Sequence, residues 1–224
     1  MRGASVLHAR PAGGATISFQ SMNATGLRTL GIAAALWAAA CGAPAPRHGV
    51  ALEPAVPRPT FTLTDTRGAP FEFNKETRGR LTFLFFGYTN CPDVCPVHVA
   101  NVAAVLHKLP GEDQQKTRFV FVTTDPARDS LPVLRHWLDQ FDATFIGLRG
   151  DDADVARVMR DLGLPPAVRS VPGPDGRYEV GHPATVIVFT ADDSAHVLYP
   201  FGTRQLDWAE DIPRLLRVRP GTGD

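Results

Sequence analysis

Two cysteines four positions apart, each followed by proline, stand in the stretch FFGYTNCPDVCPVH, residues 85–98. In a turn, this spacing brings two Cα atoms within the separation that a disulfide requires. A thiol pair held this closely can close a disulfide, exchange electrons, or chelate a soft ion, for which copper(I) is the natural match. A disulfide that only staples this small loop gains little entropy, so stapling is the least favoured interpretation.

The cysteines follow an apolar run, residues 81–86, which predicts a central strand buried on both faces. Sites of α/β sheets usually lie at the carboxyl ends of such strands. Pro96 suits a first helical position, so the next helix is expected to begin there. Cys91 and Cys95 would then lie just outside a helix N-terminus, where a thiolate is favoured.

Hydrophobic periodicity predicts the other elements that must position this loop. In chain order they are a hairpin of residues 61–63 and 70–73, a helix over 97–109, a strand over 118–124, a helix over 131–141, a strand over 145–148, a helix over 151–162, strands over 184–189 and 195–199, and a helix over 206–218. This order predicts an α/β, thioredoxin-like three-layer fold with a central mixed sheet and an N-terminal β-hairpin.

The motif CPDVCP, together with TTDPARDS at residues 123–130 and a histidine at position 182, resembles the Sco/SenC family of copper chaperones for cytochrome c oxidase assembly. The resemblance covers residues 61–218. It implies that Cys91, Cys95 and His182 bind copper, as copper(I), copper(II) or both. The predicted topology agrees, because a strand over 184–189 antiparallel to the cysteine strand would start at the same sheet edge as the cysteine loop.

The surroundings of His182 depart from the family, whose members commonly have aspartate before the histidine and serine or threonine after it. Here the neighbours are Gly181 and Pro183. Without the aspartate, an acidic partner that could orient the imidazole is missing. Pro183 compensates in part, because a residue before proline is held extended. A cis bond between His182 and Pro183 is a further hypothesis, since thioredoxin-like folds carry a cis-proline at this place.

Further polar residues lie near the motifs. His98 is an alternative ligand, although a solvated helix residue is the favoured interpretation. Asp93 could orient a ligand or dock a partner. Asp125 ends the strand beside the cysteine strand and could reach the site, but capping the turn of DPARDS is an equal alternative, and Asp129 is interpreted as a turn residue.

The N-terminal part is typical of a targeting segment. The sequence predicts an upstream extension over 1–21, with translation beginning at Met22, and a lipoprotein-type signal over 22–41 that ends at a lipidated Cys41. A plain secretory signal and an Ala-rich buried helix are the alternatives. A proline-rich tether over 42–59, the copper-binding domain over 60–218 and a flexible tail over 219–224 complete the predicted organisation. The expected location is the bacterial envelope outside the cytoplasm, with the lipid as membrane anchor.

The 23 basic residues equal the 23 acidic ones, so formal net charge is zero and gives no support to nucleic-acid binding. The resemblance implies a chaperone that delivers copper to a respiratory oxidase, with the copper-bearing subunit or another copper chaperone as partner. The alternatives are a thiol–disulfide oxidoreductase that reduces oxidase cysteines, and a copper or redox sensor. The CxxxC spacing favours the chaperone, because dedicated redox proteins use CxxC.

Overall fold

The computed structural model describes residues 46–219 of the 224-residue chain. The predicted signal segment with Cys41, and nearly all of the predicted tail, therefore lie outside the described residues. Among the residues described, no helix is both long and apolar enough to cross a bilayer.

The centre of the fold is a mixed sheet of eight strands in the order β1-β10-β9-β4-β5-β6-β2-β3. The strands are β1 (Val50–Pro57), β2 (Thr62–Asp65), β3 (Pro70–Glu72), β4 (Leu81–Gly87), β5 (Thr117–Thr123), β6 (Ile146–Arg149), β9 (Thr185–Phe189) and β10 (Ser194–Pro200). Strands β4, β5 and β6 are parallel, and β9 runs antiparallel to β4. Two short strands, β7 (Val168–Arg169) and β8 (Val180–Gly181), form a separate hairpin.

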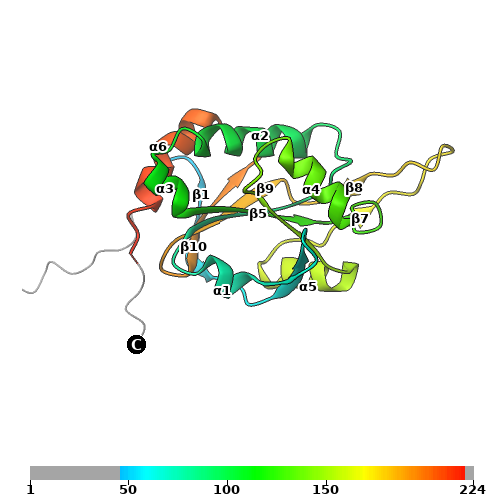
Figure 1. Ribbon diagram of the computed structural model, residues 1–224, viewed down its shortest axis with the longest axis horizontal. Coiled ribbons are helices and arrows are strands. Elements are labelled where there is room, and N and C mark those ends of the chain that lie inside the picture. The colour runs from blue at the N-terminus through cyan, green and yellow to red at the C-terminus, as the bar shows by residue number, and fades with distance from the viewer. Residues whose placement is uncertain (1–45, 220–224) are drawn as a thin grey trace, which may run out of the picture. The chain divides into compact units, whose positions relative to one another are not determined.

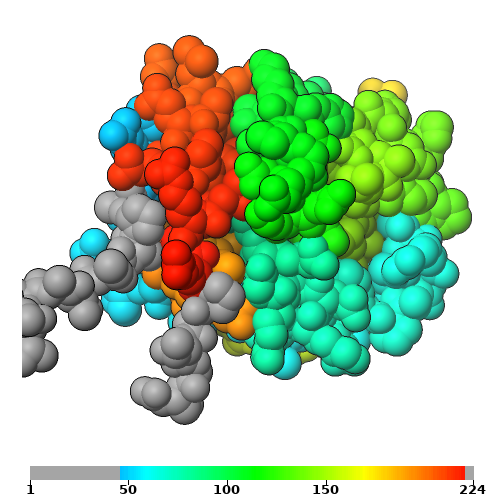
Figure 2. Space-filling view, turned by 60° about the vertical axis from the view of Figure 1, so that its left-hand side comes forward, coloured from blue at the N-terminus to red at the C-terminus, as the bar shows by residue number. Residues whose placement is uncertain are grey.

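Helices cover both faces of the sheet, which gives three layers (Figure 1). One face carries α2 (Val94–Leu106), α4 (Leu131–Asp139) and α6 (Gln205–Leu215), and the other carries α1 (Phe73–Thr77) and α5 (Asp152–Asp161); α3 (Gly111–Gln115) connects α2 to β5. The surface of α6 lies against that of α2 (Figure 2), where Gln205 Nε2 donates to Asn101 Oδ1 at 3.0 Å. The thioredoxin-like α/β fold with its β2–β3 hairpin is thus as predicted.

Strand β4 is buried along all of its seven residues. Phe83 and Phe85 pack into the core beneath α2, α4 and α6, while Leu84 and Phe86 pack into the core beneath α1 and α5. Because successive side chains of a strand point to opposite faces, a continuous apolar run is what a strand between two helical layers needs. The strand that ends at the cysteine loop is therefore held firmly from both sides.

Helix α2 begins at Val94, two residues before the predicted start at Pro96. The Asp93 carboxylate caps the helix by accepting from the Val94 amide at 2.6 Å. Pro96 is tolerated inside the first turn because amides there have no partner within the helix. The prediction that both thiols lie outside the helix is consequently wrong for Cys95, which lies in its first turn, and right for Cys91.

The predicted tether over 42–59 is also wrong in part, because its second half belongs to the sheet. Strand β1 pairs antiparallel with β10, with an interruption between Ala51 and Val56. The prolines of this stretch favour a tether when the sequence is taken alone, but an edge strand tolerates proline where a central strand does not. The chain is already fastened before β1, where the Arg47 and His48 amides donate to the buried carboxylate of Asp211 at 2.8 and 3.1 Å.

A buried arginine fixes the chain directly after β1. The Arg58 side chain is completely buried, and its guanidinium donates to the Thr77 and Thr82 hydroxyls at 2.8 and 3.1 Å. It also donates to the carbonyls of Arg80 and Thr190 and pairs with Asp193 at 2.9 Å. Since burial removes water from the guanidinium, these protein partners must replace its hydration.

Candidate metal centre

The cysteine loop leaves the carboxyl end of β4 and is tied to the end of β5. The Gly87 carbonyl accepts from the Thr124 amide at 2.7 Å, and the Cys91 amide donates to the Tyr88 carbonyl at 3.3 Å. Asp93 then starts α2. The position of Cys91 is thus set by a turn and that of Cys95 by the first turn of a capped helix.

The structure brings together the three residues that the resemblance implied as ligands. The ligand atoms of Cys91, Cys95 and His182 all lie within 4.8 Å of one another, and no other such group of three exists among residues 46–219. Cys95 Sγ lies 3.3 Å from His182 Nε2, and the Cys95 amide donates to Cys91 Sγ at 3.3 Å. Both cysteines are free thiols; Cys95 is buried and Cys91 is partly exposed.

His182 reaches this edge as the predicted topology requires, because it lies between β8 and the start of the antiparallel β9. Its Nδ1 lies 3.2 Å from the Pro183 carbonyl. A carbonyl can only accept, so this contact needs a proton on Nδ1 and leaves Nε2 as the nitrogen that faces the thiols. The backbone therefore supplies the orienting partner that the missing aspartate before His182 would have supplied.

The hypothesis of a cis bond before Pro183 is wrong. Within residues 46–219 the only cis peptide bond is Glu53–Pro54, so His182–Pro183 is trans. The His182 ring is instead held by aromatic edges, with its centroid 5.9 Å from that of Phe85 and 5.7 Å from that of Tyr88.

The two thiols are electrostatically unequal. The hydrogen bond from the Cys95 thiol, helped by the Cys95 amide and by His182, lowers the pKa of Cys91 to about 5. The same bond to Cys91, together with burial, strongly raises the pKa of Cys95. The metal-free pair consequently holds one proton, on Cys95, and one thiolate, on Cys91, which is the more exposed of the two residues. An incoming soft cation meets that thiolate first and takes the place of the proton.

We expect Cys91 to be alkylated by iodoacetamide at a rate that stays high as pH falls from 8 to 6 and halves near pH 5. An ordinary thiol, with a pKa near 8.5, would already have lost almost all of its thiolate at pH 6. Peptide mapping by mass spectrometry between pH 4 and pH 9 measures the rate at each cysteine. Cys95 should stay unmodified over the same period because it is buried. A Cys91 rate that falls tenfold per pH unit below pH 8 would contradict the assignment.

Gly87, the last residue of β4, makes room for the Cys95 sulfur. A Cβ at this position would lie 2.8 Å from Cys95 Sγ and 3.0 Å from the Phe121 ring. Because both neighbours are packed in the core, we expect Gly87→Ala to displace Cys95 and to weaken metal binding by about 10–100-fold, the size typical of a disturbed ligand. Copper(I) competition titration measures this, with Gly111→Ala, where a Cβ meets nothing within 4 Å, as the control. Equal affinity in both variants would contradict the packing argument.

Asp129 has a larger role than the turn residue that the sequence suggests. Its fully buried carboxylate accepts from the Thr89 amide at 3.0 Å and from the Thr89 and Thr123 hydroxyls at 2.6 Å each. It thereby ties the cysteine loop to the end of β5. Only its position in the motif TTDPARDS pointed to it, because nothing local in a sequence reveals which loop a carboxylate will face.

Asp125 reaches the same edge but lies outside the ligand group. Its buried carboxylate accepts from the Tyr178 hydroxyl at 2.9 Å and pairs with Arg128 and, at 3.5 Å, with Arg169. The Arg128 guanidinium stacks on the Tyr178 ring at 3.7 Å. The Asp125 carboxylate therefore anchors the β7–β8 hairpin that leads into His182. The Asp125 carbonyl also closes the predicted turn, because it accepts from the Arg128 and Asp129 amides.

His98 is buried, with 4% of its surface exposed, so the interpretation as a solvated residue is wrong. Its ring packs 5.0 Å from Phe85 and 6.1 Å from Trp208, and neither of its nitrogens has a hydrogen-bond partner among the residues described. Burial lowers the pKa of His98 to about 4, so the ring is neutral. It does not belong to the Cys–Cys–His group. Asp93 is exposed and acts as a helix cap.

The chain is similar to proteins of one family. The SCO1/SenC family model matches residues 51–217. A candidate copper-binding protein of Stutzerimonas stutzeri is 34% identical over 146 residues, which cover 63% of this chain and 69% of that protein. The structure of Bradyrhizobium japonicum ScoI with copper bound superposes with a TM-score of 0.64 and 33% identity, covering 72% of this chain and all of that one.

Two more relatives extend the comparison. The solution structure of apo Sco1 from Thermus thermophilus gives a TM-score of 0.68 at 30% identity, covering 78% of this chain and all of that one. The mitochondrial protein SCO2 of Saccharomyces cerevisiae is 35% identical over 100 residues, or 45% of this chain and 33% of that protein. The matched region thus spans about a third of this mitochondrial relative's length.

Proposed function

The chain belongs to the SCO1/SenC family, and on this basis we propose that it is a copper chaperone that binds copper through Cys91, Cys95 and His182 and delivers it to the copper centre of a respiratory cytochrome c oxidase. The convergence of two thiols and one imidazole within 4.8 Å is the observation that carries the proposal. The copper-bound structure of the Bradyrhizobium japonicum relative supports it.

The donor set suits a metal that must be bound and released. Thiolates select copper(I), and an imidazole adds a ligand that also suits copper(II). Cys91 is the more exposed of the two cysteine residues, and we propose that its sulfur meets a thiolate of a partner, so that copper passes from one protein to the other by ligand exchange. The copper-bearing subunit of the oxidase, or another copper chaperone, is the proposed partner.

We also propose that Cys41 carries a lipid that holds the protein on a membrane of the bacterial envelope, outside the cytoplasm. The support is the sequence alone: an apolar stretch of small residues that closes on Cys41, followed by Gly-Ala-Pro-Ala-Pro. Intact mass of the mature protein tests this, since a lipidated N-terminal cysteine adds the mass of its acyl chains.

A thiol–disulfide oxidoreductase is the second candidate, favoured by the lowered pKa of Cys91 and the free state of both thiols. Such an enzyme attacks a substrate disulfide with its thiolate and resolves the mixed disulfide with its second thiol. That exchange needs only the two thiols, whereas a copper site also uses His182 as a ligand, which is why the chaperone is the better account of the site.

One titration separates the two functions. The reduced protein is titrated with copper(I) against a competing chelator, beside Cys91→Ser, Cys95→Ser and, as a matched cysteine control, Cys41→Ser. The chaperone predicts one tightly bound copper per chain, lost in the first two variants and kept in the third. Affinity no higher than that of a generic dithiol, combined with fast turnover of a disulfide substrate, would favour the oxidoreductase. Copper transfer to an isolated copper-bearing oxidase domain then tests delivery.

A further inference from the structure

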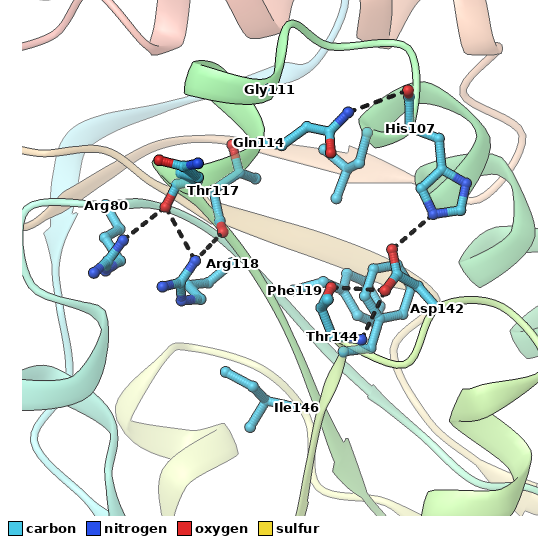
Figure 3. Close-up of a pocket in the computed structure, with 13 residues that line it drawn as sticks. Arg80, His107, Gly111, Gln114, Thr117, Arg118, Phe119, Asp142, Thr144 and Ile146 are labelled. Atoms are coloured by element: carbon cyan, nitrogen blue, oxygen red, sulfur yellow. Dashed lines mark hydrogen bonds and ion pairs between the residues drawn. The ribbon is translucent and has the colours of Figure 1, made fainter.

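A cavity of about 770 Å³, drawn in Figure 3, is lined by residues such as Arg80, Thr117 and Arg118. These residues lie at the end of β4 and β5 opposite the one that leads to the thiols. The cavity opens beside the first residues of β4 and β5, Leu81 and Thr117, which are paired in register. The cysteine loop follows the other end of β4, seven residues away, which is a distance of about 20 Å along a strand. A ligand in this cavity would not touch the metal centre.

Two arginines converge at the cavity. Arg80 Nη1 and Arg118 Nη1 donate to the same oxygen, the Gln115 carbonyl, at 2.7 and 3.1 Å (Figure 3). Arg118 Nη1 also donates to the Thr117 carbonyl at 2.7 Å. The backbone therefore holds two positive charges side by side, an arrangement in which they repel each other unless an anion lies between them.

The described chain provides no such anion. Neither Arg80 nor Arg118 forms an ion pair with any residue between 46 and 219. The nearby carboxylates are engaged elsewhere: Asp142 pairs with His107 at 2.7 Å, and Glu112 pairs with Lys116 at 2.5 Å. Glu76 lines an adjoining cavity with both arginines but lies too far from either for an ion pair.

The two guanidiniums keep free hydrogen-bond donors. Nε and Nη2 of Arg80 and of Arg118 donate to no acceptor within the described part of the chain. Burial, and then the positive charge of Arg80, lower the pKa of Arg118, and no carboxylate opposes this shift. Both side chains line a second cavity of about 520 Å³ beside the first. The charged donors are thus open to a ligand from two sides.

We propose that Arg80 and Arg118 form a binding site for a phosphate-type oxyanion carried by a small organic ligand, whose body lies in the 770 Å³ cavity. Guanidinium groups match the geometry of phosphate oxygens and bind them through paired, charge-assisted hydrogen bonds. The cavity wall adds apolar contacts for the rest of the ligand, from Leu106, Phe119, Phe145 and Ile146. The shared chemistry, a phosphate ester, fits a free phosphorylated compound and a phospholipid headgroup alike.

Isothermal titration of the full chain with phenyl phosphate at low salt tests the site. We expect saturable binding at one site that inorganic phosphate displaces. The affinity for phenyl phosphate should fall at least tenfold in Arg118→Gln and in Arg80→Gln, because each variant loses at least one charge-assisted hydrogen bond to the phosphate. The control is Arg177→Gln, which removes the same charge from a side chain that is 89% exposed in the β7–β8 hairpin. Copper(I) affinity should be equal in all four proteins, so the result does not depend on the proposed chaperone function.

A second arm identifies the source of the phosphate. Vesicles of phosphatidylglycerol and of phosphatidylcholine are offered to the same four proteins in a sedimentation assay. Phenyl phosphate binding that both site variants weaken assigns a free phosphorylated ligand. Binding only to phosphatidylglycerol vesicles, again weakened by both variants and not by the control, assigns a lipid headgroup. No binding in either arm, or equal binding by Arg118→Gln, Arg80→Gln and the wild type, overturns the proposal, with thermal unfolding confirming that each variant is folded.

Discussion

Replacement of His182 by alanine is expected to abolish tight binding of copper(II) and to leave copper(I) bound. Copper(I) is satisfied by two thiolates, whereas copper(II) prefers nitrogen and oxygen ligands and a higher coordination number. Loss of a hydrogen-bonded partner of a metal ligand already costs about 10–100-fold in affinity, so loss of the imidazole itself should cost copper(II) more than about 100-fold. The measurements are copper(II) paramagnetic resonance, which reports the bound nitrogen, and competition titration with each oxidation state.

The matched variant for this test is His98→Gln, which removes the other histidine beside Phe85. Its nitrogens lie outside the Cys–Cys–His group, so copper(II) affinity and the nitrogen signal should stay as in the wild type. If only the His98 variant lost copper(II), the assignment of His182 as the third ligand would be wrong.

Replacement of Arg58 by alanine is expected to destabilise the protein by about 3–5 kcal/mol, as the breaking of buried charge networks typically does. The variant leaves the Thr77 and Thr82 hydroxyls and the Thr190 carbonyl without their donor in the interior. Chemical denaturation gives the free energy of unfolding. The midpoint of thermal unfolding should fall by about 10 °C for a domain of this size.

Arg78 provides the control, because it pairs with the same Asp193 carboxylate at 3.6 Å but is 69% exposed. An exposed ion pair contributes only about 0–1 kcal/mol, so Arg78→Ala should change stability little. Similar losses in both variants would show that the pair with Asp193, and not the buried hydrogen bonds of Arg58, carries the stabilisation.

The sheet could be predicted from the sequence wherever a local pattern reflects burial. The apolar run of β4 and the helical spacing of α4 and α5 are visible without any tertiary information, and in the structure Ser130 and Asp151 cap those two helices. Strand β1 could not be predicted, because its pairing with β10 depends on an edge formed by residues that follow it by more than a hundred positions.

The metal centre, too, could be predicted from the sequence only in part. Cys91 and Cys95 were visible from spacing, and His182 from family resemblance joined to topology. The supports of these residues were not visible: Asp129 holds the loop through Thr89, and the Pro183 carbonyl orients the imidazole. Such contacts join positions that are distant in sequence or use backbone atoms, so side-chain patterns do not reveal them. Burial of His98 was missed because the packing of α6 against α2 covers a face that a single helix leaves open.

The fastening of Arg47 and His48 to Asp211 sets how far the protein could travel if Cys41 carries a lipid, as proposed. From Cys41 to Arg47 there are six residue steps, which even a fully extended chain covers in at most about 20 Å. That is about half the thickness of a bilayer with its headgroups. A copper carrier on so short a tether cannot shuttle across a wide compartment, so under this proposal it would serve acceptors that are held at the same membrane.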